Sequence, residues 1–240
     1  EDNLTSHCTD GLLAAWLGFP SRNRDSLLLS RNRHESCQRG VNLAMSYPCD
    51  ASALGERMTD CTVGILVQGA DGILHLDSSI LDHNTACGLQ VTATNTLVTC
   101  SGSTFADQPN QAINLGNIDP ASAITHCIFD NQGSDITSTN PIPVSYSCFA
   151  HQTVAGTGNL SMTDPQLDRT YFKLLPTSPC IDAGSVTATL PDTDFEGDPR
   201  TIGVRPDLGA DEYAPAGTVR TFGVAGLGLP AMSPQIRSPD

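Results

Sequence analysis

The sequence predicts an all-β protein, a parallel β-helix solenoid with coils of about 24 residues. The first observation is that the same residue types return every 24 residues between Cys37 and Asn131. The second is that apolar residues within each copy lie two positions apart, as Leu89 and Val91 do, which is the period of a β-strand. A repeat of this length is typical of stacked units that bury their apolar faces against one another. One inward column consists of Val41, Ile65, Leu89 and Ile113.

Residues 1–26 lie outside this repeat and are predicted to form an N-terminal cap. Asp10 is a helix-capping residue type, and Gly18 and Pro20 would end a short capping helix over residues 11–17. A solenoid needs a cap over the open end of its first coil. The alternative is that this helix docks on a partner.

Residues 27–152 are predicted to form the coils, each with three short strands. A second inward column places large apolar side chains on successive coils, where we expect them to stack in the core: Leu81, Phe105, Phe129 and Phe149. A polar column follows it, consisting of Asn84, Gln108 and Gln132. We expect these amides to bond to one another and to backbone groups that a tight turn leaves without partners.

The charge of the chain excludes two classes of partner. It carries 26 acidic and 12 basic residues, for a net charge of −14, and Lys173 is its only lysine. Such a surface repels phosphate backbones and anionic lipids, so we expect no nucleic-acid or membrane-surface binding. No apolar run reaches transmembrane length. An acidic, lysine-poor chain with nine cysteines favours an exported protein, in which disulfides persist.

The cysteines show no zinc-binding spacing, and one pair is a candidate disulfide. Cys37 and Cys61 occupy the same column on adjacent coils, about 4.8 Å apart, which is within disulfide range. We therefore predict a Cys37–Cys61 disulfide. Cys148 and Cys180 are further candidates that could fasten the C-terminal part, although spacing alone leaves their connectivity open.

A polar row at one corner of the coils is the candidate ligand-binding or partner-binding surface: His83, Asp107, Asn131 and His151. His83 and Asp107 should be neighbours on adjacent coils. An aspartate that orients a histidine can serve as a general base, but the sequence shows no nucleophile beside this pair. We therefore predict an exposed contact surface, with catalysis as the alternative.

A run of acidic residues is the candidate metal site: Asp192, Asp194, Glu196 and Asp198. With Gly197 it resembles the first half of a calcium-binding loop, which makes Ca²⁺ the possible cofactor. Gly203 stands where such a loop needs a bidentate acid. The alternative interpretation is that these acids only shape a turn.

The C-terminal part carries a second, more specific pattern. It consists of Gly158, Asn159, Asp164, Pro165, Leu174, Ser178, Pro179, Ile181, Asp182, Ala183, Gly184, Gly197, Arg200, Asp207, Gly209, Ala210 and Glu212. This pattern resembles the closing segment of bacterial extracellular right-handed parallel β-helix proteins, the pectate-lyase-like group with a choice-of-anchor-type ending. Cys180 and Asp211 depart from the usual alanine and aromatic residue. The resemblance covers residues 144–213 and implies a right-handed solenoid and export.

The resemblance gives residues 153–213 as a closing segment, and 214–240 remain as a Pro/Gly-rich tail or linker. It implies no single activity. We expect an exported cell-surface or cell-envelope module that acts as a structural or adhesive scaffold for polysaccharide or protein partners. The first alternative is a polysaccharide lyase or glycoside hydrolase acting on acidic polysaccharide. The second is an accessory subunit of a cell-envelope assembly.

Overall fold

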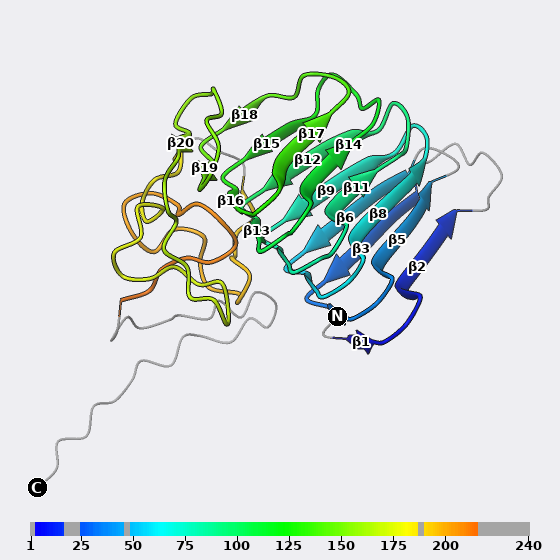
Figure 1. Ribbon diagram of the computed structural model, residues 1–240, viewed down its shortest axis with the longest axis horizontal. Coiled ribbons are helices and arrows are strands. Elements are labelled where there is room, and N and C mark those ends of the chain that lie inside the picture. The colour runs from blue at the N-terminus through cyan, green and yellow to red at the C-terminus, as the bar shows by residue number, and fades with distance from the viewer. Residues whose placement is uncertain (1–2, 17–24, 46–48, 187–189, 216–240) are drawn as a thin grey trace, which may run out of the picture.

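The computed structural model describes residues 3–16, 25–45, 49–186 and 190–215, and these form a parallel β-solenoid. In chain order the strands pass in turn through three sheets, so each sheet gains one strand per coil (Figure 1). The described residues contain strands and no α-helix. No helix among them is therefore long and apolar enough to cross a membrane.

The three sheets run along the stack of coils. Sheet A contains β1 (Leu4–Ser6), β4 (Arg33–Glu35), β7 (Arg57–Thr59), β10 (Ile80–Asp82), β13 (Thr104–Ala106), β16 (Ile128–Asp130), β19 (Cys148–Phe149) and β20 (Leu160–Ser161). Sheet B contains β2 (Asp10–Trp16), β5 (Arg39–Met45), β8 (Val63–Gly69), β11 (Cys87–Val91), β14 (Gln111–Leu115) and β17 (Ser134–Ser138). Sheet C contains β3 (Asp25–Ser30), β6 (Cys49–Leu54), β9 (Ile73–Asp77), β12 (Leu97–Ser101), β15 (Ala123–Thr125) and β18 (Val144–Ser145).

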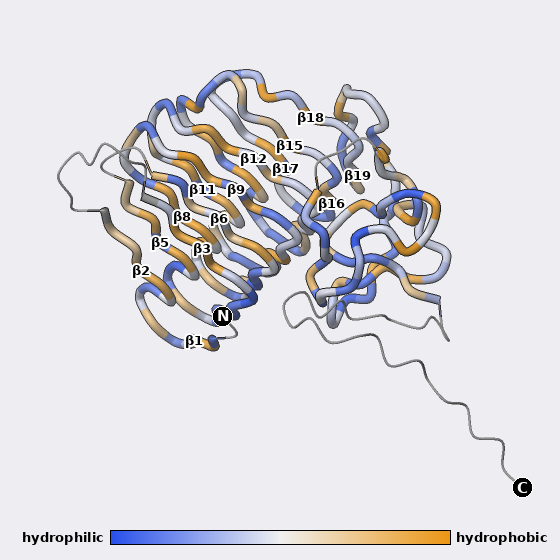
Figure 2. The backbone as a smooth tube through the Cα atoms, turned by 180° about the vertical axis from the view of Figure 1, so that it is seen from behind, coloured by the Kyte–Doolittle hydropathy of each residue, from blue (hydrophilic) through white to orange (hydrophobic). Residues whose placement is uncertain are grey.

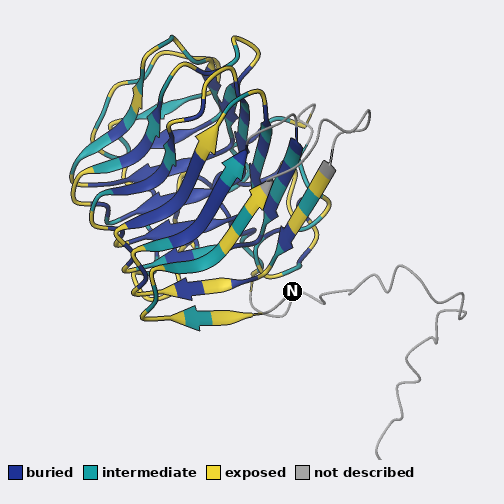
Figure 3. Ribbon diagram, turned by 90° about the vertical axis from the view of Figure 1, so that its right-hand side faces the viewer, coloured by how far each residue is buried: buried dark blue, intermediate teal, exposed yellow. Residues whose placement is uncertain are grey.

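The 24-residue register of the central coils is confirmed. Leu89 of β11 pairs with Ile65 of β8 on one side and Ile113 of β14 on the other. Alternate residues of strands such as β6 and β9 are buried, and the apolar ones form the core cluster. Figure 2 shows hydrophobic residues along the strands of the coils. Figure 3 shows the buried residues collected inside the coils.

The predicted aromatic stack is confirmed at the centre of the core. Phe105 and Phe129 pair across β13 and β16, with ring centroids 5.2 Å apart, and Phe129 and Phe149 follow at 4.9 Å. The planes of each pair differ by only 5°. All three rings are fully buried, and Leu81 lies on the adjacent strand β10. A stack of this kind fixes the register of sheet A, because a shift by one residue would turn every ring out of the core to the other face of the sheet.

The predicted amide column is confirmed at Asn84 and Gln108, both of which are buried. The Asn84 side chain accepts a hydrogen bond from the Cys61 N–H at 3.1 Å, and that of Gln108 donates to the carbonyl of Leu81 at 2.8 Å. The third member is Asn131, whose Oδ1 accepts from the Gln108 N–H at 3.2 Å. The predicted Gln132 is exposed instead.

The cause of this one-residue shift is the length of the corner after each sheet A strand. His83 and Asp107 are inserted there with φ of 55° and 54°, left-handed values that histidine and aspartate tolerate better than most residues. Their own N–H groups donate to the next coil, at Ala106 and Asp130. After β16 no such residue is inserted, so Asn131 itself reaches the column.

The described part of the N-terminal segment does not form the predicted capping helix. Residues 10–16 form strand β2 of the first coil rather than a capping helix. Leu12 and Ala14, two positions apart, pack against the core, whereas Leu13 between them is 60% exposed. This alternation suits a strand, and pairing with β5 supplies hydrogen bonds that so short a helix would lack. Residues 1–2 and 17–24 of the predicted cap lie outside the described part.

The closing segment packs on the outer face of sheet A, beside the coils (Figure 1). Outward-facing apolar residues of the sheet, among them Ile80, Ala106 and Ile128, contact Phe172 and Leu208 of this segment. This contact explains why β10, β13 and β16 are buried on both faces. Residues 216–240 of the predicted tail lie outside the described part of the chain.

Candidate functional site

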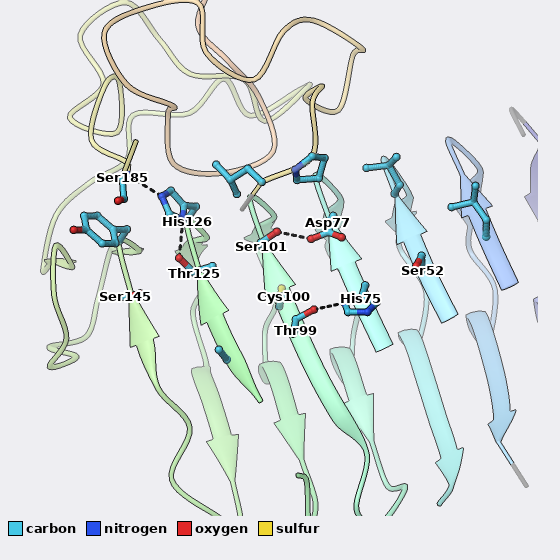
Figure 4. A pocket seen from close by; sticks show the side chains of 16 residues that line it. Ser52, His75, Asp77, Thr99, Cys100, Ser101, Thr125, His126, Ser145 and Ser185 are labelled. Atoms are coloured by element: carbon cyan, nitrogen blue, oxygen red, sulfur yellow. Dashed lines mark hydrogen bonds between the residues drawn. The ribbon is translucent and has the colours of Figure 1, made fainter. Parts of the chain in front are cut away.

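The outer face of sheet C, which the closing segment leaves open, forms one side of a groove of about 770 Å³ (Figure 4). Its floor consists of side chains that alternate with inward-facing residues such as Leu74 and Leu76. Two rows run across successive strands. The first row consists of Ser52, His75 and Thr99, and the second of Asp77, Ser101, Thr125 and Ser145.

Neighbouring groups within these rows are already paired. The Thr99 hydroxyl lies 2.6 Å from His75 Nδ1 across β12 and β9, and the Ser101 hydroxyl donates to Asp77 Oδ1. Figure 4 shows both pairs on adjacent strands. Because the strands are parallel and in register, hydroxyl, imidazole and carboxylate groups recur at the strand spacing of about 4.8 Å.

His126 closes the groove where sheet C meets the closing segment. Its Nε2 accepts a hydrogen bond from the Ser185 N–H at 2.8 Å, so its Nδ1 carries the proton and donates to the Thr125 hydroxyl at 2.6 Å. Burial, reinforced by the charge of Arg200, lowers the pKa of His126 to about 4. Its ring stacks on Tyr146 with centroids 5.4 Å apart. The histidine is therefore a neutral, fixed part of the wall.

Asp77 is the only carboxylate among the described residues that line the groove. Burial raises its pKa above the ordinary value, and the hydrogen bond from Ser101 opposes that effect. No arginine or lysine occurs among the described lining residues. Apolar side chains complete the walls, notably Leu28, Leu54 and Pro191. The groove is thus rich in hydrogen-bonding groups, partly apolar and only weakly charged.

The predicted corner row lies elsewhere, at the edge of sheet A. His83 Nε2 is 3.6 Å from Asp107 Oδ2, so these two residues are neighbours as expected. His83 also lies 3.1 Å from Asp82 through Nδ1, and its ring meets Phe172 edge-on. His151 lies 3.4 Å from Asp130 and is 56% exposed. The row therefore consists of imidazole and carboxylate groups that contact one another, with the two histidines about half exposed.

The structure corrects the assignment of Asn131 to this exposed row. Asn131 is 1% exposed, and its side chain is committed to Gln108 N–H and, at 3.0 Å, to Asp135. Arg169 of the closing segment also covers the row, 3.3 Å from Asp107 and 2.6 Å from Asp130. The corner thus holds the closing segment in place, a role that sequence spacing could not reveal because Arg169 lies 62 residues from Asp107.

The predicted calcium ligands do not converge. Asp194 accepts hydrogen bonds from the N–H groups of Glu196, Asp198 and Glu212, at 2.8–2.9 Å. Glu196 pairs with Lys173 at 2.5 Å, and Asp192 is exposed. No group of three or more His, Cys, Asp or Glu residues in the described ranges could hold a metal. Backbone N–H donors therefore surround the Asp194 carboxylate, an arrangement that favours the turn-shaping interpretation over the calcium site.

The predicted Cys37–Cys61 disulfide is not formed. Both residues are thiols, and Cys37 Sγ lies 2.7 Å from Cys8 Sγ instead. Cys61 Sγ points at the backbone carbonyls of His34 and Thr59, at 3.6 and 3.5 Å. The prediction missed Cys8 because the first coil is longer, placing this cysteine 29 residues before Cys37.

Sequence reasoning missed the sheet C groove, although a signal for it was present. His75 and Thr99 are 24 residues apart, and so are Asp77, Ser101 and Thr125. These polar columns lie between the apolar columns of sheet C and so mark its outer face. The wall formed by residues 185–191 could not be placed from the repeat, because the closing segment does not follow it.

Comparisons of the chain with known protein families, with curated proteins and with solved structures find no match.

Proposed function

We propose that this chain is an exported β-solenoid module that binds a neutral glycan in the sheet C groove, in a structural or adhesive role. The observation that carries the proposal is the groove itself, in which two rows of hydrogen-bonding side chains form the floor and apolar side chains complete the walls. Ligand sites are typically concave and partly apolar, with a few polar groups that fix orientation.

The chemistry of a sugar chain fits this lining. A sugar offers hydroxyl groups around its rim and apolar C–H surfaces on its faces. Ser52, His75 and Thr99 can bond to hydroxyls, while Leu54 and Pro191 offer apolar contact. Because the rows cross successive strands, hydrogen-bonding groups follow one another along the groove at the strand spacing, which suits an extended polymer.

Charge favours a neutral glycan over an acidic one. The chain has a net charge of −14, and the described lining contains Asp77 but no cation. A polyuronate would meet repulsion with no arginine or lysine to offset it. The interpretation as a lyase on acidic polysaccharide weakens for the same reason, since such chemistry needs a group that neutralises the uronate.

The raised pKa of Asp77 favours a glycoside hydrolase as the second candidate, because a protonated carboxyl can act as a general acid. Glycoside hydrolysis usually requires a second carboxylate about 5–9.5 Å away. Asp77 has no such companion among the described lining residues. Binding without turnover is therefore the better-supported function.

Export is the part of the proposal that rests on sequence. The acidic, lysine-poor composition supports it, and so does the resemblance of residues 144–213 to the ending of extracellular β-helix proteins. Cell fractionation of the native source tests it, with recovery in the cytoplasm as the contrary result.

The decisive experiment is binding of the full chain to immobilised neutral glycans, such as glucans and galactomannans, beside pectin and alginate. The double variant His75→Ala/Thr99→Ala removes a paired donor and acceptor from the floor of the groove. We expect roughly tenfold weaker binding to the neutral glycan, the effect of losing one or two hydrogen bonds.

The matched control is Gln90→Ala/Asn114→Ala, which removes a polar pair in register on sheet B. This variant should bind as the wild type does. Equal loss in both double variants would contradict a site on sheet C. Release of new reducing ends by the wild type, abolished by Asp77→Asn, would show a hydrolase instead.

A further inference from the structure

Three cysteines occupy one corner column at the N-terminal end of the solenoid. Cys8, Cys37 and Cys61 each follow a residue with left-handed φ that comes directly after a sheet A strand. Those preceding residues are His7, Ser36 and Asp60, with φ of 52°, 52° and 54°. The next two coils carry Asn84 and Gln108 at the same place, so the cysteines replace amide side chains in a continuous column.

Side chains of this column contact backbone carbonyls of the preceding coil, and Cys61 does so too. The Asn84 and Gln108 side chains donate to the carbonyls of Met58 and Leu81 in the preceding coil. The Cys61 thiol lies 3.6 Å from the equivalent carbonyl, that of His34. Cys61 is completely buried and has the surroundings of an unreactive thiol.

Cys8 and Cys37 differ from it in contact and exposure. Their sulfur atoms are 2.7 Å apart, closer than those of Cys100 and Cys127, which are 3.6 Å apart. Cys37 is 2% exposed, whereas Cys8 is only half-buried. A reagent from solvent therefore reaches Cys8 first, and the Cys8 sulfur contacts that of Cys37.

We propose that Cys8 and Cys37 are a disulfide-forming pair and that Cys61 remains a thiol. The Cys8 thiolate attacks a low-molecular-weight disulfide, RSSR, forming a mixed disulfide and releasing one RS⁻. The Cys37 thiolate then attacks the Cys8 sulfur, forming the Cys8–Cys37 bond and releasing a second RS⁻. Each cysteine loses one proton, and the two electrons pass to the small disulfide, which is reduced to two thiols.

This bond would fasten the least supported part of the coils. Strand β1 pairs with β4 alone and is the edge of sheet A. A Cys8–Cys37 bond would join this edge coil to the next across 29 residues of chain, and closing such a loop lowers the entropy of the unfolded state. The disulfide would therefore stabilise the first coil against fraying, although no capping helix forms over residues 10–16.

The sequence allows the pair to be identified directly. Tryptic cleavage places Cys8 in peptide 1–22 and Cys37 in peptide 34–39, each as the only cysteine, while Cys61 falls in peptide 58–169. The reduced full chain is treated with oxidised glutathione, unfolded, alkylated and digested without reduction. We expect peptides 1–22 and 34–39 to be joined and Cys61 to carry the alkyl group.

Two variants complete the test. Cys61→Ser changes the same column but should leave the 1–22 to 34–39 link intact, whereas Cys8→Ser should leave Cys37 alkylated. Oxidation should also raise the melting temperature of the wild type and of Cys61→Ser, but not of Cys8→Ser, and added reductant should reverse the gain. A link from peptide 34–39 to peptide 58–169 in the wild type, or both short peptides alkylated after oxidation, would overturn the proposal.

Discussion

Phe129 is the residue on which the packing of the core depends most. Its ring is fully buried between those of Phe105 and Phe149, within about 5 Å of each. We expect Phe129→Ala to lower the free energy of unfolding by about 3–5 kcal/mol, the usual cost of removing a buried phenylalanine. The gap would open in the middle of the stack, where coils on both sides hold the backbone in place.

Urea denaturation followed by far-ultraviolet circular dichroism measures this loss. Tyr171→Ala is the control, because Tyr171 is 58% exposed and its removal should change stability little. A loss below about 1 kcal/mol for Phe129→Ala would mean that the neighbouring rings close the gap.

At the scale of elements, the closing segment is the part whose attachment depends on charge. Arg169 bridges Asp107 and Asp130, and Asp130 is only 5% exposed. Because Arg169 itself is 53% exposed, solvent screens part of the attraction. We expect Arg169→Ala to cost about 1–2 kcal/mol, mainly because it leaves the buried Asp130 carboxylate without its cation.

Hydrogen exchange should locate this effect in the closing segment. The amides of Phe172 and Leu174, which bond to Asp168 and to the Asp211 carboxylate, should exchange faster in Arg169→Ala. Those of sheet B should not change. Arg205→Ala, at an exposed arginine of the same segment, is the control. Uniform acceleration along the whole solenoid would show that segment and coils unfold together.

At the scale of the whole molecule, buried carboxyl groups set the response to pH. Burial, with the nearby charge of Asp207, raises the pKa of Glu212 to about 9, and burial raises that of Asp211 to about 7. The folded chain therefore holds protons that the unfolded chain has released. Stability falls as pH rises from about 4.5, the ordinary pKa of Glu212, through 9.

Thermal melting at pH 7 and pH 9 tests this sign. Over that range His126, whose pKa is lowered from 6.5 to about 4, is neutral in the folded chain and mostly neutral in the unfolded chain, so it contributes only a small change of the opposite sign. We expect a lower melting temperature at pH 9 and a smaller decrease in Glu212→Gln, which keeps an acceptor for the Asp207 N–H. An equal decrease in the variant and the wild type would assign the effect to other groups.

The sequence by itself determined the coils. Apolar residues such as Leu89, Phe105 and Phe129 have apolar counterparts one coil period before or after them in the sequence. Each lies next to its counterpart on the neighbouring coil, so the sequence repeat predicts which residues are neighbours in the structure. The same repeat correctly predicted that His83 lies next to Asp107. It failed where a coil departs from the period, as at Cys8, Gln132 and the strand formed by residues 10–16.

Only the tertiary structure decided what covers the coils and what they leave open. The closing segment has no repeat, so nothing in the sequence placed Arg169 against Asp130, or His126 beneath Ser185. These contacts join residues 39 and 59 positions apart and depend on how one apolar surface of the segment fits sheet A. Because that fit closes the face of sheet A and leaves sheet C open, it also decided where the groove lies.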